Sequence, residues 1–205
     1  MTVAAPAALL SRLGVFVDET FLDEATTERV LAEMRQARRG AATVYGSGRR
    51  RVRRGTRSTK RADIADETKE LVERRLEEVR PQLEARLGLP LGAAQAPEFL
   101  VYEEGDYFRA HRDTAREGDE APEYIGRRKV SAVVFLNRRT DAPEPEAYGG
   151  GALVLYGLLP SPDGEERGAI APAQPGTLVA FRSEVVHEVR PVEHGERFTI
   201  VSWFE

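Results

Sequence analysis

Two stretches decide the fold class: residues 128–137 read RKVSAVVFLN, and residues 197–204 read RFTIVSWF. Both are short runs of β-branched and aromatic residues bounded by polar segments, which is the pattern of β-strands. Four similar runs are EFLVY at 98–102, GALVLY at 151–156, GTLVAF at 176–181 and VVHEVRPV at 185–192. No helical pattern lies between these runs, so the sequence favours an antiparallel sandwich or jelly roll over an α/β fold.

The region before these strands is helical in pattern, because apolar residues recur every three or four positions. Asp23 is placed to cap a first helix that ends just before Gly40. A second helix begins near Asp66, and Pro81 is expected to kink or restart it. We expect these N-terminal helices to pack on the outside of the larger sheet.

The length of 205 residues predicts a single domain, residues 1–205, with a helical support region at 1–97 and a jelly-roll core at 98–205. The longest apolar runs are far shorter than the roughly 20 residues that span a bilayer. The alanine-rich residues 1–10 lack the features of a signal peptide, so we interpret them as a ragged start and predict a cytoplasmic protein. The chain has no cysteine, so any protein-bound metal must use His, Asp or Glu.

A basic segment, RRRVRRGTRSTKR at residues 49–61, contains eight basic residues and no acidic one. The rest of the chain holds 22 basic and 34 acidic residues, a net charge of −12. Like charges repel and cannot form a core, so we predict a flexible loop over residues 46–61. Its residues 49–61 would be either a lid that helps to capture an acidic substrate or a solvated loop. The segment could instead contact nucleic-acid phosphates, but the acidic body and the lack of interleaved aromatic residues argue against nucleic acid.

The sequence contains three histidines, and two of them suit metal binding. His111 and Asp113, in the segment HRD, point to the same side of an extended backbone, so an imidazole nitrogen and a carboxylate oxygen can converge on one ion. A third ligand is needed, and His187 in VVHEV is the candidate. His194 lies in the segment EHGE and is expected to be a solvated turn residue.

The turn at residues 193–196 predicts that residues 185–192 pair with residues 196–204 as a hairpin. In that register His187 and Arg197 face the same side, about 13 Å apart along the strand at roughly 3.3 Å per residue. A small dianion that ligates a metal at His187 could then meet the guanidinium of Arg197 at its far end.

From about Thr56 to Glu205 the chain resembles the prolyl 4-hydroxylase-like branch of the Fe(II)- and 2-oxoglutarate-dependent dioxygenases. The resemblance rests on YEEGDYFRAHRD at 102–113, SAVVFLN at 131–137, GGGAL at 149–153, Pro-Gly at 175–176, and the closing set His187, Arg197 and Trp203. Each motif is common by itself, whereas their combination in this order is specific. The family's fold, a double-stranded β-helix or cupin-like jelly roll, is therefore the expected architecture.

The resemblance implies a site for Fe(II), 2-oxoglutarate and O2, with ascorbate as a supporting reductant. The implied residues are His111, Asp113 and His187 for the metal, Arg197, Tyr102, Ser131 and Thr199 for 2-oxoglutarate, and Trp203, Arg128 and Arg57 for the substrate. Relatives often carry a tyrosine in the strand at 131–137, where this chain has Phe135 as its nearest aromatic residue. Ser131 or Thr199 is expected to supply the missing hydroxyl.

The implied activity is hydroxylation of an aliphatic C–H bond, with conversion of 2-oxoglutarate to succinate and CO2. A prolyl residue of a peptide or protein is the favoured substrate by resemblance, and a free amino acid or other small metabolite is the nearest alternative. A second alternative is a nucleic-acid-directed enzyme or binder that uses residues 49–61. A third is a non-catalytic sugar- or metal-binding jelly roll, which would have no use for Arg197.

Overall fold

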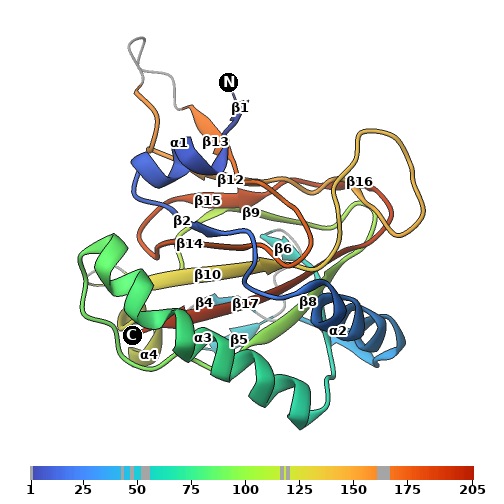
Figure 1. Ribbon diagram of the computed structural model, residues 1–205, viewed down its shortest axis with the longest axis horizontal. Helices are drawn as coiled ribbons and strands as arrows, with labels where there is room; N and C mark the ends of the chain where they lie inside the picture. Colours follow the sequence, from blue (N-terminus) through green and yellow to red (C-terminus); the bar gives the residue numbers. More distant parts are fainter. Residues whose placement is uncertain are drawn as a thin grey trace.

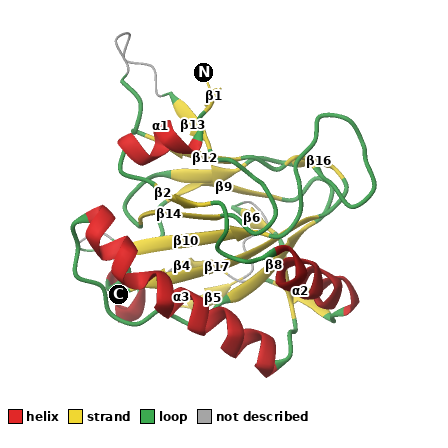
Figure 2. Ribbon diagram, in the orientation of Figure 1, coloured by secondary structure: helices red, strands yellow, loops and turns green. Residues whose placement is uncertain are grey.

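The computed structural model describes residues 2–42, 44–46, 49–51, 56–115, 118, 121–160 and 167–205, and two β-sheets dominate it (Figures 1 and 2). The larger sheet has the order β2 (Phe16–Asp18), β14 (Leu178–Arg182), β10 (Val130–Phe135), β17 (Arg197–Phe204), β8 (Glu98–Tyr102), β7 (Lys60–Ala62) and β3 (Arg39–Ala41). The smaller sheet has the order β1 (Thr2–Ala4), β13 (Gly168–Ile170), β12 (Leu153–Tyr156), β15 (His187–Val189), β9 (Tyr107–His111) and β6 (Arg57–Ser58).

Two short strand pairs lie beside the main sheets: β11 (Gly149–Gly150) with β16 (Val192–His194), and β4 (Val44–Gly46) with β5 (Arg49–Arg51). The central strands of both main sheets are paired antiparallel, for example β10 with both β14 and β17. The parallel pairing is that of β1 with β13, at the edge of the smaller sheet. The predicted jelly-roll architecture with N-terminal helices is confirmed.

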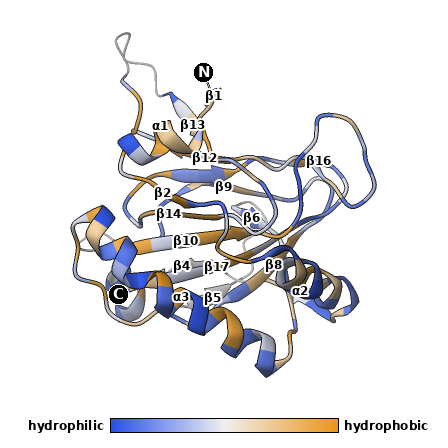
Figure 3. Ribbon diagram, viewed as in Figure 1, coloured by the Kyte–Doolittle hydropathy of each residue, from blue (hydrophilic) through white to orange (hydrophobic). Residues whose placement is uncertain are grey.

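The described helices are α1 (Ala7–Arg12), α2 (Glu24–Gln36), α3 (Asp66–Leu87) and α4 (Glu123–Gly126). Figure 1 shows α2 and α3 in front of the larger sheet, where their apolar stripes pack against its outer face. In Figure 3 polar and apolar residues alternate along α3, as expected for a helix with one buried stripe. No helix among the described residues combines the length and apolar composition needed to cross a bilayer.

The ends of the helices follow the predictions only in part. The Asp23 carboxylate accepts a hydrogen bond of 2.7 Å from the backbone N–H of Thr26, so the predicted N-cap of α2 is confirmed. The helix ends earlier than predicted, because the chain before Gly40 turns extended and joins the sheet, where Gly40 pairs with Arg61. Of the two effects predicted for Pro81, a restart of the helix is wrong, since α3 continues through it with buried residues on both sides.

The larger sheet separates two apolar cores. One core lies between this sheet and helices α2 and α3, and the other lies between the two sheets. Strand β17 contributes to both, because side chains alternate along a strand. Phe198, Ile200 and Phe204 pack toward the helices, while Val201 and Trp203 line the cavity on the opposite face, as predicted.

The predicted hairpin between residues 185–192 and 196–204 is wrong. Strand β15 pairs with β12 and β9 in the smaller sheet, whereas β17 pairs with β10 and β8 in the larger one. In the predicted register Arg197 lies opposite Pro191, but in the structure it lies opposite Tyr102. A short turn can join strands of different sheets as readily as strands of one hairpin, and the local sequence does not distinguish the two.

The N-terminal residues are a structured part of the fold, not the predicted ragged start. Strand β2 extends the larger sheet by pairing with β14, and β1 pairs with β13. Leu10 and Val15 are fully buried in the core between the sheets. Apolar residues spaced across short elements give only a weak periodic signal, so their burial depends on the sheets already being in place.

The basic segment also enters the fold more deeply than a solvated loop would. Arg57 is 7% exposed in β6, and Thr59 donates a hydrogen bond of 2.9 Å to the backbone carbonyl of Val101. Strand β7 follows, and its Arg61 forms an ion pair with Glu98. The loop predicted over residues 46–61 is therefore wrong for its C-terminal part, because β8 and β9 offer unpaired edges to it. Residues 47, 48 and 52–55 lie outside the described part of the chain.

Candidate active site

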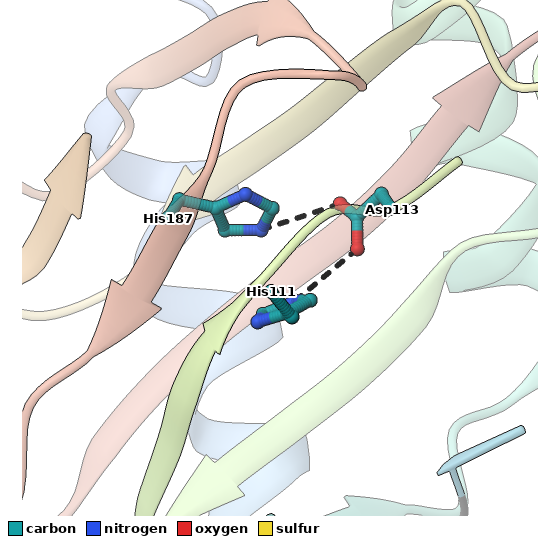
Figure 4. A group of neighbouring side chains, drawn as sticks. All are labelled: His111, Asp113 and His187. Carbon is teal, nitrogen blue, oxygen red and sulfur yellow. Dashed lines mark ion pairs between the residues drawn. The ribbon is translucent and has the colours of Figure 1, made fainter. Parts of the chain in front are cut away.

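Three predicted ligands converge between the two sheets (Figure 4). His111 ends β9, Asp113 follows two residues later, and His187 begins β15 directly opposite His111 in the pairing register. The Nε2 atoms of His111 and His187 lie 3.3 and 3.4 Å from the two carboxylate oxygens of Asp113. Potential ligand atoms of all three residues lie within 4.8 Å of one another, a spacing that suits one metal ion.

Backbone carbonyls orient both imidazole rings. The Nδ1 atom of His111 lies 2.8 Å from the carbonyl of Arg109, and that of His187 lies 2.9 Å from the carbonyl of Val185. A carbonyl only accepts, so each Nδ1 carries the proton and each Nε2 presents its lone pair toward Asp113 when the ring is neutral. Metal-ligating histidines commonly have this kind of supporting partner.

Burial and charge set the protonation of the three groups. Burial alone would raise the pKa of the Asp113 carboxyl, but the charge of His187 and hydrogen bonds from both histidines hold that pKa well below its usual value. Burial and the neighbouring His187 lower the pKa of His111. Burial opposes the charged form of His187, but the Asp113 carboxylate outweighs this and raises the His187 pKa. The ionised carboxylate of Asp113 and the neutral imidazole of His111 are therefore favoured, and these are the forms that bind metals.

Aromatic side chains restrain the two histidines from the side. The ring of Phe108 stacks on His111 with a centroid distance of 3.5 Å, and Phe181 meets His187 edge-on at 4.8 Å. The two imidazole rings themselves lie 4.2 Å apart. These contacts leave the imidazoles little freedom to turn away, so the two histidine ligands are held in place before any ligand binds.

Arg197, the first residue of β17, is 1% exposed and lines the same cavity as the three candidate ligands. Its guanidinium carbon lies 5.0 Å from the ring centre of Tyr102 and 5.2 Å from that of Phe135, and its Nη1 donates a 3.2 Å hydrogen bond to Thr199. Its Nε and Nη2 are buried without a hydrogen-bond partner among the described residues. Because a buried cation with unsatisfied donors is costly, this position fits the distal carboxylate of a dicarboxylate ligand.

Of the other predicted residues, three line the cavity and Arg128 packs against one of these three. Tyr102, Trp203 and Arg57 line the cavity together with the candidate ligands and Arg197. Arg128 stacks on Trp203 with its guanidinium carbon 3.6 Å from a ring centre, and donates to the side chain of Gln95.

Of the two hydroxyls expected near Arg197, only that of Thr199 is there. The Ser131 hydroxyl lies 2.9 Å from the Ser183 hydroxyl, so it already has a hydrogen-bond partner away from Arg197. Ser131 lies near the far end of β10, opposite Trp203, whereas Arg197 begins β17 at the other end. Ser131 and Arg197 are therefore far apart along the paired strands, and the sequence motif alone did not give this register.

His194 is not the solvated turn residue that was predicted. It lies in β16, opposite Gly149, and its ring occupies the space that a side chain at position 149 would need. Its Nε2 is buried without a hydrogen-bond partner among the described residues. The lack of a side chain at Gly149 therefore leaves room for the His194 ring.

Tyr148 is a neighbour of Arg197 that the sequence reasoning missed. It is fully buried, and its hydroxyl has no hydrogen-bond partner in the described part of the chain. Burial raises the pKa of its phenol, and the nearby charge of Arg197 opposes that increase. A tyrosine directly before three glycines was the available signal, but the motif at 149–153 was considered without the residue that precedes it.

A family model for the 2OG-Fe(II) oxygenase superfamily matches residues 97–205, which is more than half of the chain. The chain therefore belongs to the 2OG-Fe(II) oxygenase superfamily. The matched region begins just before β8 and contains the His/Asp/His cluster, Arg197 and Tyr148.

Individual relatives agree with this membership. PKHD-type hydroxylases of Synechococcus elongatus and Maricaulis maris are each 34% identical, over 107 and 103 residues, covering 52% and 50% of this chain. The matched regions span only 41% and 38% of those relatives' lengths.

Solved structures resemble nearly the whole chain. A Pseudomonas putida prolyl-4-hydroxylase superposes with a TM-score of 0.67 at 26% identity, covering 96% of this chain and 94% of that one. A Trichoplax adhaerens prolyl hydroxylase, solved with a hypoxia inducible factor peptide fragment, has a TM-score of 0.65 at 19% identity and covers 97% of this chain and 86% of its own. The second likeness supports the fold alone.

Proposed function

We propose that this protein is an Fe(II)- and 2-oxoglutarate-dependent dioxygenase that hydroxylates an aliphatic C–H bond of its substrate. One observation carries the proposal: a His/Asp/His cluster and a buried arginine with unpaired donors line the same cavity. A metal-binding jelly roll without 2-oxoglutarate chemistry would gain nothing from such an arginine, because burying an unpaired cation is costly.

The residues present fit both groups. His111, Asp113 and His187 would hold Fe(II) on one face, leaving other positions open for ligands. Arg197 would pair with the distal carboxylate of 2-oxoglutarate, while Tyr102 would line the cosubstrate pocket. The chemistry that bound Fe(II) would supply is O2 activation, which would couple hydroxylation of the substrate C–H bond to the conversion of 2-oxoglutarate to succinate and CO2.

The protein's own contribution is to orient and to exclude water. Phe108 and Phe181 keep the two imidazoles in position, and the apolar walls between the sheets keep water away from the reacting groups. Trp203 offers a flat apolar surface beside the candidate ligands, and Arg128 stacks on it. We assign the substrate to this side of the cavity, with Arg57 as a third contact on β6.

The substrate that we favour is a prolyl residue in a peptide or protein. The name of one similar structure supports it, since the Pseudomonas putida protein is a prolyl-4-hydroxylase. Arg57 and Arg128 would favour acidic groups near the target residue. Nucleic acid is disfavoured because Lys60 and Arg61, within the basic segment, are already paired with Glu103 and Glu98. The cytoplasmic location remains a prediction.

Succinate release with Fe(II) and 2-oxoglutarate tests the reaction and the substrate class together. Prolyl peptides with and without flanking acidic residues, free amino acids and oligonucleotides form the panel. We expect turnover to rise with a prolyl peptide, most with acidic flanks. A response confined to free amino acids or oligonucleotides would overturn the substrate assignment while leaving the chemistry intact.

Anaerobic spectroscopy tests the metal site directly. Fe(II) plus 2-oxoglutarate should produce a visible charge-transfer band, and His187→Ala should abolish it because one of three ligands is lost. His194→Ala is the matched control, since His194 packs on Gly149 and is not in the cluster. An unchanged band in His187→Ala would remove this residue from the site.

A further inference from the structure

We propose that Tyr148 is a second anchor for the distal carboxylate of 2-oxoglutarate, its phenol donating a hydrogen bond to the carboxylate that Arg197 binds. This inference rests on the proposed function, because it concerns the same cosubstrate. Tyr148 precedes β11, whereas Arg197 begins β17, so the two side chains come from different elements.

Unsatisfied polar atoms gather at this pair. Tyr148 Oη, Arg197 Nε and Arg197 Nη2 are all buried and lack hydrogen-bond partners among the described residues. Buried polar groups in folded proteins almost always have partners, so three such atoms on two neighbouring side chains indicate a missing acceptor. Arginine nitrogens only donate, and a phenol can donate, so the matching ligand is an anion with several acceptor sites, as a carboxylate has.

A bare backbone allows the two side chains to approach. A Cβ atom at Gly151 would lie 3.0 Å from Cε2 of Tyr148 and 3.1 Å from Cδ of Arg197. Gly151 also has a positive φ of 54°, which disfavours other residues. The triple glycine thus leaves room for the phenol and the guanidinium stem on the same side of the chain.

Electrostatics keep the phenol in the form that donates. Burial raises the pKa of Tyr148, so its hydroxyl retains its proton, although the Arg197 charge acts in the opposite direction. A protonated phenol is uncharged, so it does not repel a carboxylate bound to the neighbouring guanidinium, and its O–H can donate one hydrogen bond to that carboxylate.

Such a pair would select for dicarboxylates. 2-Oxoglutarate carries the distal carboxylate, whereas 2-oxobutanoate has the same metal-binding end without it. The energy of the extra hydrogen bond would therefore be available only to 2-oxoglutarate. A tyrosine that serves packing alone would affect both ligands to the same degree.

Calorimetric titration of the Mn(II)-loaded protein measures binding without turnover. Tyr148→Phe should weaken 2-oxoglutarate binding about tenfold or more, the effect expected when a hydrogen bond to a charged group is lost. The binding of 2-oxobutanoate should not change. Tyr156→Phe is the matched control, because that hydroxyl already donates a hydrogen bond to Glu188.

The outcomes separate this inference from the proposed function. If the wild type does not bind 2-oxoglutarate, the proposed function fails. If the wild type binds it and Tyr148→Phe binds it equally well, or if both ligands weaken together, Tyr148 is not an anchor. Should Tyr148→Phe fail to fold, near-ultraviolet difference spectra test the inference instead. 2-Oxoglutarate should perturb a tyrosine signal that 2-oxobutanoate leaves unchanged, and the perturbation should persist in Tyr102→Phe. No perturbation of a tyrosine signal in Tyr102→Phe would overturn the inference.

Discussion

At the scale of single residues, the site depends on where polar groups are left without partners. The Asp113 carboxylate already contacts both imidazoles, so the metal cluster has internal ion pairs even without an ion. Arg197 has no comparable arrangement: one of its nitrogens reaches Thr199, and two are unpaired within the described structure. The cluster can therefore persist by itself, whereas the arginine site needs an anion.

Arg197→Ala should weaken 2-oxoglutarate binding by about 2–5 kcal/mol, because the distal carboxylate would be buried without its counter-charge. Titration of the Mn(II)-loaded variant measures this loss, and binding of Mn(II) itself should be preserved. Arg197→Lys should be intermediate, since an ammonium keeps the charge but lacks the forked geometry. Unchanged cosubstrate affinity in Arg197→Ala would place the distal carboxylate elsewhere.

At the scale of elements, the two faces of β17 have different roles, one in stability and the other in function. Its outward side chains pack against α2 and α3, and its inward ones line the cavity. Because strand side chains alternate, one eight-residue strand serves the helix-facing core and the active site at once. Substitutions on the two faces should consequently have different effects.

Phe198→Ala should lower the free energy of unfolding by about 3–5 kcal/mol, the range for removing a large buried aromatic side chain. Phe198 is 1% exposed and packs in the core beneath the helices. Urea unfolding measures the loss. Val201→Ala, on the half-buried cavity face of the same strand, is the control and should cost less stability. Equal losses would mean that the two faces are not independent.

At the scale of the whole molecule, the sheets are completed by segments distant in sequence. The first 18 residues supply α1 and the strands β1 and β2, each of which forms one edge of its sheet, and Leu10 and Val15 in this segment are fully buried. Deleting residues 1–18 should cost several kcal/mol of stability, at about 1.5–3 kcal/mol for each large side chain exposed. Deleting residues 1–4 removes only β1 and should cost much less. Thermal unfolding compares the two, and equal stability of wild type and the longer deletion would contradict this packing.

Metal binding should stabilise the whole fold, because the three candidate ligands join β9 to β15 and an ion bound to the folded state shifts the equilibrium away from unfolding. At about 100 times its dissociation constant, Mn(II) would add about 2.7 kcal/mol. That corresponds to an increase in Tm of roughly 5–10 °C for a protein of this size. Chelation should reverse the increase, and His187→Ala should show none; an equal increase in that variant would point to a different metal site.

The sequence by itself determined the features that depend on local patterns. Alternating β-branched runs predicted the strands, the HxD spacing paired His111 with Asp113, and the alternation along residues 197–204 separated the helix-facing side chains from the cavity-facing ones. These predictions succeeded because a strand's period of two is a property of its own backbone.

Only the tertiary structure decided which strands became neighbours. The turn near Gly195 is compatible with a hairpin, yet β15 and β17 lie in opposite sheets, and His187 and Arg197 line the same cavity from these two sheets. The same packing buried the N-terminal residues and brought Tyr148 to Arg197. Pairing partners are selected by burial of apolar faces over the entire chain, which is a non-local energy that no short motif contains.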